Sequence, residues 1–370
     1  MKTIRRLIYV EVLKAVSFVA LGFLCLFFFF DLVDELQNIA KPGSSGYGMV
    51  QALIYVALLV PGHLYELLPI AVLIGTVFVM ARLAETSEYT ILRTSGLGPW
   101  RALRTLLVLG LGFVVLTFLV GDYVAPVSNQ ASLVLKARYR MFYAMAGTGT
   151  GAWIKERQGD KSYAVNVRTM DPDGNLKNPR IFEFDAKGSL SSQTTAQFAR
   201  IENNGVWTLH DAKRQEYLQG DPVHPRVVND TQSVMQWPSS LSREMISVAL
   251  LDPERMSTID LFEYIRHLDA NGQTTRRYEI EFWRKVFYPL SCLVMIVLAL
   301  PFAYLHFRQG GITGYVFGGV MIGISFFLLN NVFGYIGNLG NWVPWISAAA
   351  PGLIYSVVSL AAFGWLVLRR

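Results

Sequence analysis

Cysteine is scarce in this sequence, which has only two such residues in 370 positions. Cys25 and Cys292 both lie inside long apolar runs, and none occurs in the polar stretch from about Pro126 to about Arg277. Disulfide frameworks and structural zinc sites both depend on groups of cysteines. The polar stretch therefore has neither a disulfide framework nor a thiolate metal site, and we assign no metal ligands.

Motifs of catalysis and nucleotide binding are missing as well. The sequence has no Gly-x-x-x-x-Gly-Lys-Ser/Thr loop, whose backbone amides and lysine hold nucleotide phosphates. His210 and His224 are isolated and form no Ser/His/Asp or Cys/His set, and a lone histidine is more often a surface residue than a catalytic one. We assign no catalytic residue and expect this chain to bind no cofactor itself.

Charged residues make up only 16% of the chain, whereas 52% of its residues are hydrophobic. The charges cluster between apolar runs that contain no Lys or Arg, and each run is long enough to cross a lipid core of about 30 Å as a helix. This pattern predicts a polytopic α-helical membrane protein with six transmembrane helices. The runs are Val16–Phe30, Leu64–Ala81, Leu106–Gly121, Phe287–Leu305, Ile312–Ile336 and Trp345–Leu368.

Lys and Arg are distributed unequally between the two sides of these runs. One side holds Lys41 alone, and the other carries most of the basic residues of the short loops. Such residues accumulate on the cytoplasmic side, so both termini are predicted to be cytoplasmic and the polar insert to face outward. The net charge of +6 reflects this bias and does not indicate nucleic-acid binding. The basic side comprises Lys2, Arg5, Arg6, Arg82, Arg93, Arg101, Arg104, Arg308, Arg369 and Arg370.

The insert changes from long apolar blocks to short segments separated by turn residues. Asp171-Pro172-Asp173-Gly174-Asn175 is one such turn, and Ile181-Phe182-Glu183-Phe184-Asp185 alternates apolar and polar side chains as a half-buried strand does. The pattern predicts antiparallel strands in an open sandwich or β-jellyroll. The expected strands are Ala152–Arg157, Ser162–Thr169, Arg180–Asp185, Ser192–Ile201, Val206–Tyr217 and Thr231–Trp237.

The cytoplasmic loop from Ala81 to Gly96 is predicted to contain a short acidic helix. Leu83, Ile91 and Leu92 could form its apolar side, Glu85 and Glu88 lie one turn apart, and Gly96 is a suitable C-terminal stop. A helix lying on the membrane surface is the alternative interpretation, but such helices usually carry Lys and Arg on their polar face. We therefore favour docking into a groove on a soluble partner.

Four segments give the chain a resemblance to a known family. They are Glu88–Gly96 in the loop, Gly121–Pro126 at the end of the third span, Val248–Pro253 after the insert, and Phe282–Leu290 entering the fourth span. These segments are similar to those of the lipopolysaccharide export permeases, the LptF/LptG (YjgP/YjgQ) family, and more to its LptG branch. The similarity runs in order through nearly the whole chain.

The resemblance implies a subunit of an ABC transporter in the Gram-negative inner membrane, with its insert in the periplasm. Its implied partners are a second, LptF-like permease, an LptB-like cytoplasmic ATPase dimer that binds ATP and Mg²⁺, and LptC-like and LptA-like jellyroll bridge proteins. The acidic helix, at about residues 84–96, then resembles the coupling helix, with Glu88 at the position that docks into the ATPase. The implied coupling residues are Glu85, Glu88, Tyr89, Leu92 and Arg93.

The implied substrate, lipopolysaccharide, has phosphates that need cations and acyl chains that need an apolar surface. Lysine and arginine bind phosphate through charge-assisted hydrogen bonds, although interfacial anchoring is an alternative role for each of them. A departure from the family is the acidic end of the first span, with Asp31, Asp34 and Glu35 where lysines are common. The candidate contacts are Lys41, Lys136, Arg138 and Arg284 for phosphate, and Phe27, Phe317 and Ile324 for acyl chains.

The expected organisation has three parts: residues 1–125 with three spans and the coupling helix, a periplasmic β-jellyroll with its connectors at 126–277, and three further spans at 278–370. A membrane-anchored sensor or scaffold, whose insert binds a periplasmic ligand, is the alternative function. His63 and Glu66 could form a proton relay at the outer end of the second span, although a solvated pair is the simpler interpretation.

Overall fold

The structure is a computed structural model that describes residues 2–39, 47–86, 88–94, 96, 98–139, 151–171, 174–202, 205–218, 226–250, 252–304 and 312–365. The chain divides into two compact units. The first, the bundle unit, comprises Met1–Asp34, Val56–Ser128 and Glu279–Arg370. The second, the sheet unit, comprises Glu35–Tyr55 and Asn129–Tyr278. Each unit is described separately below.

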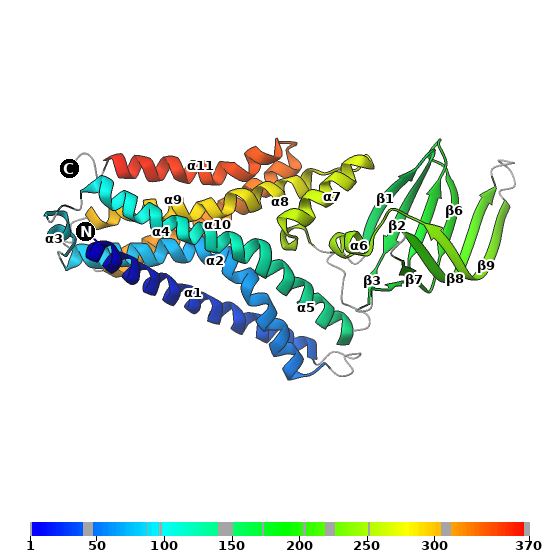
Figure 1. Ribbon diagram of the computed structural model, residues 1–370, viewed down its shortest axis with the longest axis horizontal. Coiled ribbons are helices and arrows are strands. Elements are labelled where there is room, and N and C mark those ends of the chain that lie inside the picture. Colours follow the sequence, from blue (N-terminus) through cyan, green and yellow to red (C-terminus); the bar gives the residue numbers. More distant parts are fainter. Residues whose placement is uncertain are drawn as a thin grey trace. The chain divides into compact units, whose positions relative to one another are not determined.

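Long apolar helices make up the bundle unit (Figure 1). In the described residues, six helices are long and apolar enough to cross a membrane, which confirms the six predicted spans. The helices and short π or 3₁₀ turns that belong to it wholly or in part are α1 (Lys2–Ile39), α2 (Met49–Glu85), α3 (Glu88–Thr94), α4 (Pro99–Leu119), η1 (Val120–Val124), α5 (Ala125–Tyr139), α8 (Arg276–Phe287), η3 (Tyr288–Leu290), α9 (Ser291–Ala299), η4 (Leu300–Tyr304), α10 (Ile312–Leu339) and α11 (Pro344–Phe363).

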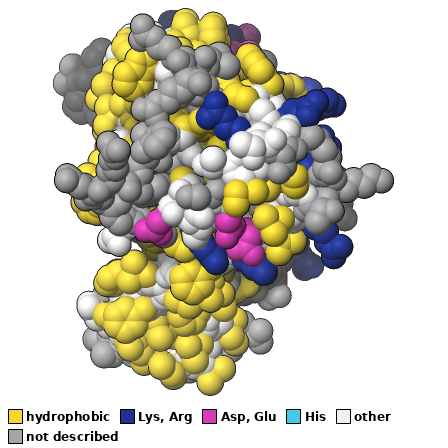
Figure 2. Space-filling view, turned by 90° about the vertical axis from the view of Figure 1, so that its left-hand side faces the viewer, with side chains coloured by type: hydrophobic (Ala, Val, Ile, Leu, Met, Phe, Trp, Pro, Cys, Tyr) yellow, Lys and Arg dark blue, Asp and Glu magenta, His cyan; other side chains and the backbone are white. Residues whose placement is uncertain are grey.

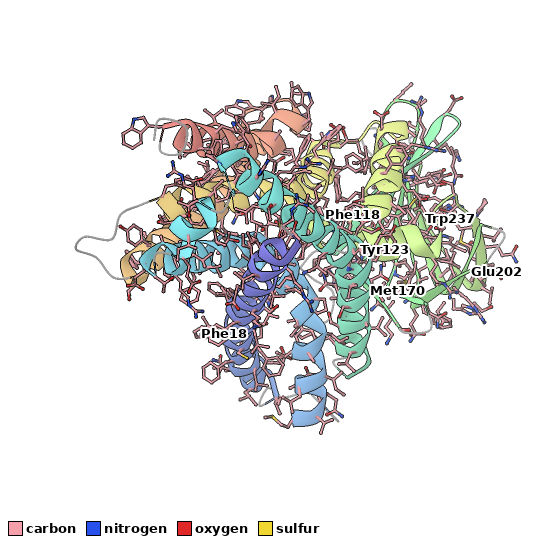
Figure 3. All side chains as sticks on the ribbon, turned by 60° about the vertical axis from the view of Figure 1, so that its left-hand side comes forward. Phe18, Phe118, Tyr123, Met170, Glu202 and Trp237 are labelled. Carbon is pink, nitrogen blue, oxygen red and sulfur yellow. The ribbon has the colours of Figure 1, made fainter. Side chains whose placement is uncertain are left out.

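Close helix packing in the bundle unit depends on small residues. A Cβ added at Gly75 of α2 would lie 2.7 Å from the backbone nitrogen of Val16, so only glycine lets α1 approach α2 this closely. On α10, Gly319 and Gly323 face Val77 and Ile70 of α2. The outward surface of the bundle unit carries large apolar side chains, as expected of helices in lipid. Figure 3 labels three of these exposed side chains, Phe18, Phe118 and Tyr123.

Helix α2 contains two prolines, Pro61 and Pro69, which lack the N–H that would continue the helical hydrogen-bond ladder. In each case the backbone carbonyl three residues before the proline accepts a hydrogen bond from a hydroxyl group of another segment. Ser128 Oγ donates to the Leu58 carbonyl at 2.7 Å, and the Tyr288 hydroxyl donates to the Glu66 carbonyl. These two bonds join α2 to other segments of the chain close to its prolines.

The sheet unit contains one antiparallel sheet of nine strands, curled as Figure 1 shows. The strand order is β1-β2-β5-β6-β8-β7-β4-β3, with β9 paired to β8. This curled sheet confirms the predicted β-rich insert. The strands are β1 (Ala152–Gln158), β2 (Lys161–Val167), β3 (Thr169–Met170), β4 (Leu176–Lys177), β5 (Arg180–Phe184), β6 (Leu190–Thr195), β7 (Phe198–Ile201), β8 (Val206–Leu218) and β9 (Arg226–Pro238).

Three details of the sheet differ from the sequence prediction. The expected strand Ser192–Ile201 is two strands, β6 and β7, which both pair with β8 on either side of Asp211, a residue with a φ of 52°. Strand β9 begins at Arg226 and not at Thr231. The two-residue strands β3 and β4 were not predicted at all, because they are too short to show a period of two.

A continuous apolar core lies on one face of the sheet. Trp207 is fully buried and its ring meets Trp237 edge to face, with centroids 5.1 Å apart. Leu241 and Ile246, at the helix α6 (Arg243–Ala249), complete this core. The side chains of Trp237 and Met170 are labelled in Figure 3. Two further elements, η2 (Pro253–Arg255) and α7 (Thr258–Ala270), follow before α8.

Helix, and not loop, connects the third span to the insert. The chain passes from α4 through the π turn η1 into α5, so Pro126 lies in the first turn of α5 and the helix continues to Tyr139. The sheet unit therefore includes the end of α1, the start of α2 and most of α5 in addition to the strands.

Candidate functional site

The acidic loop folds as predicted into a short helix with a glycine stop. Helix α2 ends at Glu85 and α3 spans Glu88–Thr94. Gly96 follows with a φ of 99°, which favours glycine, and its N–H donates to the Arg93 carbonyl at 3.1 Å. Glu85 and Glu88 are therefore in two different helices, and not one turn apart in one helix as expected.

One face of α3 is fixed to the bundle. Tyr89 is 4% exposed, and its ring meets that of Tyr304 edge to face at a centroid distance of 5.2 Å. The Arg93 guanidinium lies 5.7 Å from the centroid of the same Tyr304 ring, and Leu92 packs against the main apolar core. Burial, together with the nearby Tyr304, raises the pKa of Tyr89 above its ordinary value, so this phenol stays neutral.

The opposite face of α3 is open. Glu88, Thr90 and Ile91 are all exposed, and Ile91 is 63% exposed. Ile91 does not share one apolar side with Leu83 and Leu92 as predicted: those two pack against the core, whereas Ile91 lies about 200° around the helix axis from Tyr89 at 3.6 residues per turn. Glu88 and Ile91 instead share one exposed side. Figure 2 views the molecule from the side on which α3 lies in Figure 1, where Lys and Arg side chains gather with acidic ones beside them.

Lys136 on α5 is the centre of a second polar group, within the sheet unit. Its ammonium donates to Glu35 Oε2 at 3.1 Å and lies 3.8 Å from the centroid of the Tyr55 ring. The Tyr47 hydroxyl donates to Glu35 Oε1 at 2.8 Å. The side chains of Lys136 and Glu35 are only 19% and 4% exposed. We call these four residues, from α1, α2, α5 and the segment before α2, the capped lysine.

The other predicted phosphate contacts divide into described and undescribed residues. Arg284 on α8 is 17% exposed; it donates to Glu281 Oε1 at 2.8 Å and to Asn331 Oδ1 of α10 at 3.0 Å. Lys41 and the side chain of Arg138 lie outside the part of the chain that the structure describes. Both described cations, Lys136 and Arg284, therefore already have a carboxylate partner.

The predicted acyl contacts lie at two places in the bundle unit. Phe317 and Ile324 are one heptad apart on α10 and are 65% and 44% exposed, so they share an outward stripe. Phe27 on α1 is half-buried, with its ring centroid 5.0 Å from that of His63. His63 in turn pairs with Asp31 at 2.7 Å, which joins α1 to α2. The structure therefore gives His63 a polar partner on α1 that was not predicted.

No group of three or more His, Cys, Asp or Glu side chains able to hold a metal ion occurs among the described residues.

The family described as "Lipopolysaccharide export system permease LptF/LptG" matches residues 6–368 of this chain. The chain belongs to the LptF/LptG family. It is 27% identical over 340 residues to the lipopolysaccharide export system permease protein LptG of Escherichia coli K12, covering 91% of this chain and 90% of that protein. It is 26% identical over 340 residues to LptG of Haemophilus influenzae Rd, covering 92% and 91%.

Membership of the LptF/LptG family agrees with the six spans and with the β-rich insert between the third and fourth. Sequence reasoning missed four residues of the two polar sites: Ile91, which it grouped with Leu83 and Leu92, and the companions of Lys136, namely Glu35, Tyr47 and Tyr55. For Ile91, the helical period alone was enough to place the residue on the side opposite Tyr89. Glu35 was noticed only as a departure from the family, and nothing in the sequence connects it with a lysine 101 positions away.

Proposed function

We propose that this chain is one permease half of an ABC transporter that extracts lipopolysaccharide from the inner membrane and delivers it to a periplasmic bridge toward the outer membrane. The proposal rests on helix α3. One face of α3 packs into the bundle through Tyr89 and Leu92, and the other presents Glu88 and Ile91 to the solvent. A helix built in this way can receive a soluble partner on one face and pass its movement to the spans through the other.

The path of that movement starts at the contact between Tyr89 and Tyr304. Tyr304 ends η4, which continues α9, and α9 packs against α4 and α11. Displacement of α3 would therefore act on three spans at once as a rigid-body shift, a common response to nucleotide binding in a neighbouring subunit. The energy is supplied by a partner ATPase that binds ATP and Mg²⁺, and this chain acts as a transport subunit and not as an enzyme.

The proposed assembly contains a second, LptF-like permease, an LptB-like ATPase dimer, and LptC-like and LptA-like bridge proteins. In it, both termini and α3 face the cytoplasm and the sheet unit faces the periplasm of a Gram-negative cell. The first turn of α1, the end of α11 and α3 all lie at one end of the bundle unit in Figure 1, which supports this orientation. The basic residues near that end support it as well.

Substrate contact is proposed at an apolar surface and at a cationic side chain. Phe27, Phe317 and Ile324 supply apolar surface for acyl chains, and Lys136 is the described cation that we assign to a phosphate. Its ammonium can bind a phosphate through charge-assisted hydrogen bonds.

Co-purification tests the proposal. The tagged chain should bring down a partner permease and a subunit that hydrolyses ATP, and Glu88→Lys should abolish recovery of the ATPase because it reverses the charge at the docking face. Asp160→Lys, which makes the same change on an exposed turn of the sheet unit, should leave recovery intact. Recovery of a cytoplasmic partner without ATPase activity would favour the sensor or scaffold function instead.

A further inference from the structure

A π turn, η1, interrupts the long helix of the third span. The Ala125 N–H donates to the Val120 carbonyl, five residues earlier, whereas an α-helix would use the Gly121 carbonyl. The rings of Phe118 and Tyr123, labelled in Figure 3, meet edge to face with centroids 6.4 Å apart. Residues five apart in an α-helix lie about 140° apart around the axis, so this contact depends on the π turn. Single π turns frequently occur at functional positions.

The π turn changes the hydrogen bonding of the Gly121 carbonyl. Its α-helical donor, the Ala125 N–H, is bonded to Val120, and the next residue, Pro126, has no N–H. Gly121 is buried, and a buried carbonyl needs a hydrogen bond. The Lys285 ammonium of α8 donates to this carbonyl at 3.2 Å. A lysine before the fourth apolar run therefore takes the place of a backbone N–H in the third span.

Lys285 and the turn are packed closely together. Lys285 is only 8% exposed, and its ammonium lies 5.7 Å from the centroid of the Tyr65 ring of α2. A Cβ added at Gly121 would overlap this same ring, so only glycine lets Tyr65 pack directly on the backbone here. The Tyr65 ring also lies 5.1 Å from that of Tyr288, the first residue after α8. Elements α2, η1 and α8 therefore meet at the turn.

Lys285 belongs to the segment that the proposed coupling path reaches. The elements α8, η3, α9 and η4 follow one another without a gap from Arg276 to Tyr304. Tyr304, at the far end of this segment from Lys285, is the residue whose ring meets Tyr89 of α3. A displacement of α3 that moves the fourth span would therefore move Lys285 as well.

Resting on the proposed function, we propose that Lys285 is a positioning residue that holds η1 in its π form, and that movement of the fourth span withdraws it so that η1 becomes α-helical. The Ala125 N–H then transfers from the Val120 carbonyl to the Gly121 carbonyl, and the Val124 N–H donates to Val120. Hydrogen bonds are exchanged, and no covalent bond forms or breaks. The helix beyond the turn rotates about its axis by roughly 100°, the step of one residue.

Spin labels at Val115 on α4 and Val127 on α5, both exposed, measure this rotation in the complex of two permeases and the ATPase, with a cysteine-free chain. In a continuous α-helix these positions lie about 120° apart around the axis, and the π turn reduces this to about 20°. A non-hydrolysable ATP analogue should therefore lengthen the distance between the labels by about 5 Å. An unchanged distance, in a complex that hydrolyses ATP and releases lipopolysaccharide, would overturn the proposal.

Substitutions of Lys285 test its part in the turn. Lys285→Met keeps a long side chain but removes the donor, so the longer distance should appear without nucleotide. ATP-driven release of lipopolysaccharide should fall roughly tenfold, because the rotation no longer follows ATP binding. Lys285→Arg keeps a cationic donor and should retain the shorter resting distance. Lys14→Met removes an exposed lysine of α1 and is the matched control, which should change neither measurement.

The outcomes separate this proposal from the proposed function. A resting distance that stays short in folded Lys285→Met would overturn the role of Lys285, even if the analogue still lengthens the distance in the wild type. If Lys285→Met does not fold, the wild-type distances with and without the analogue decide. Failure of the wild-type chain to recover an ATPase would overturn the proposed function, and with it the withdrawal of Lys285.

Discussion

Helix α3 and the capped lysine use charge in opposite ways. At α3 the acidic side chain is exposed, and the anchoring contacts are the buried Tyr89 and the half-buried Leu92, which are mostly apolar. At the capped lysine the charges themselves are buried and balance each other. An exposed charge is available for recognition at little cost to the fold, whereas a buried pair contributes to holding its two helices together. The first arrangement suits the docking of a partner and the second suits the joining of α1 to α5.

Removal of the lysine alone should have the largest effect on stability. Lys136→Met removes a cation that pairs with the buried Glu35 carboxylate, and loss of one member of a buried pair costs about 3–5 kcal/mol. We expect a decrease of about 3 kcal/mol in the free energy of unfolding, measured by urea unfolding in detergent. The double variant Glu35→Gln/Lys136→Met should recover most of this loss. If it does not, packing and not charge holds the site together.

Truncation of Tyr89, which anchors α3 to the bundle, should have the next largest effect on stability. Tyr89→Ala removes a buried aromatic ring beside Tyr304, and such changes cost about 3–5 kcal/mol in a protein core. The effect should appear locally, as faster hydrogen exchange of the α3 amides. Thr90→Ala, on the exposed side of the same helix, should change stability by less than about 0.5 kcal/mol. Equal effects of the two substitutions would contradict the two-faced arrangement of α3.

A smaller effect is expected where α3 meets its partner. Ile91→Ala should leave the stability of the chain unchanged, because Ile91 is exposed, yet weaken ATPase binding by about 1–2 kcal/mol, or roughly tenfold in Kd. A binding titration with the purified ATPase measures this. Ile259→Ala, at a similarly exposed isoleucine on α7, is the control and should have no effect. Weakening by both would mean that the loss is nonspecific.

The smallest effect is expected for the ion pair between Glu183 and Lys161, which only partly resembles the pair between Glu35 and Lys136. Burial opposes ionisation of Glu183, but hydrogen bonds from Lys161 and Ser192 and the charge of Arg214 outweigh it and lower the pKa of Glu183 below its ordinary value of 4.5. Its contribution to stability is therefore present above pH 4.5 and is lost as the pH falls through the lowered value. In the Glu183→Gln variant, stability should depend less on pH in this range. The fluorescence of Trp207 and Trp237 during acid unfolding measures this. An acid unfolding profile identical to that of the wild type would mean that Glu183 does not contribute to the pH dependence of stability.

Local patterns predicted much of this fold. Runs of apolar residues fixed the six spans, and alternation with turn residues located most strands, because both signals are contained in neighbouring residues. Gly96 was correctly expected to stop α3. Helix α7 was missed although its start carries a capping box, with Ser257 three residues before Asp260. That signal was present in the sequence and was overlooked.

Contacts between distant segments could not be predicted in the same way. Glu35 and Lys136 are 101 positions apart, and His63 pairs with Asp31, 32 positions away, and these distances are set by how helices pack. Helix α10 has two glycine pairs with a spacing of four, Gly314 with Gly318 and Gly319 with Gly323. The second pair faces α2, whereas nothing lies within 4 Å of a Cβ built at either glycine of the first pair. A spacing of four predicts that two residues share a face, but not which neighbour that face meets.

ATP-dependent release of lipopolysaccharide from proteoliposomes tests the central claim most directly, with the two permeases and the ATPase reconstituted together. The wild-type complex should transfer lipopolysaccharide to an added periplasmic acceptor when ATP is supplied. A complex in which Glu88 and Ile91 are replaced by Lys and Asp should transfer none, while its lipopolysaccharide binding stays intact. Transfer at the wild-type rate by that variant would contradict the account.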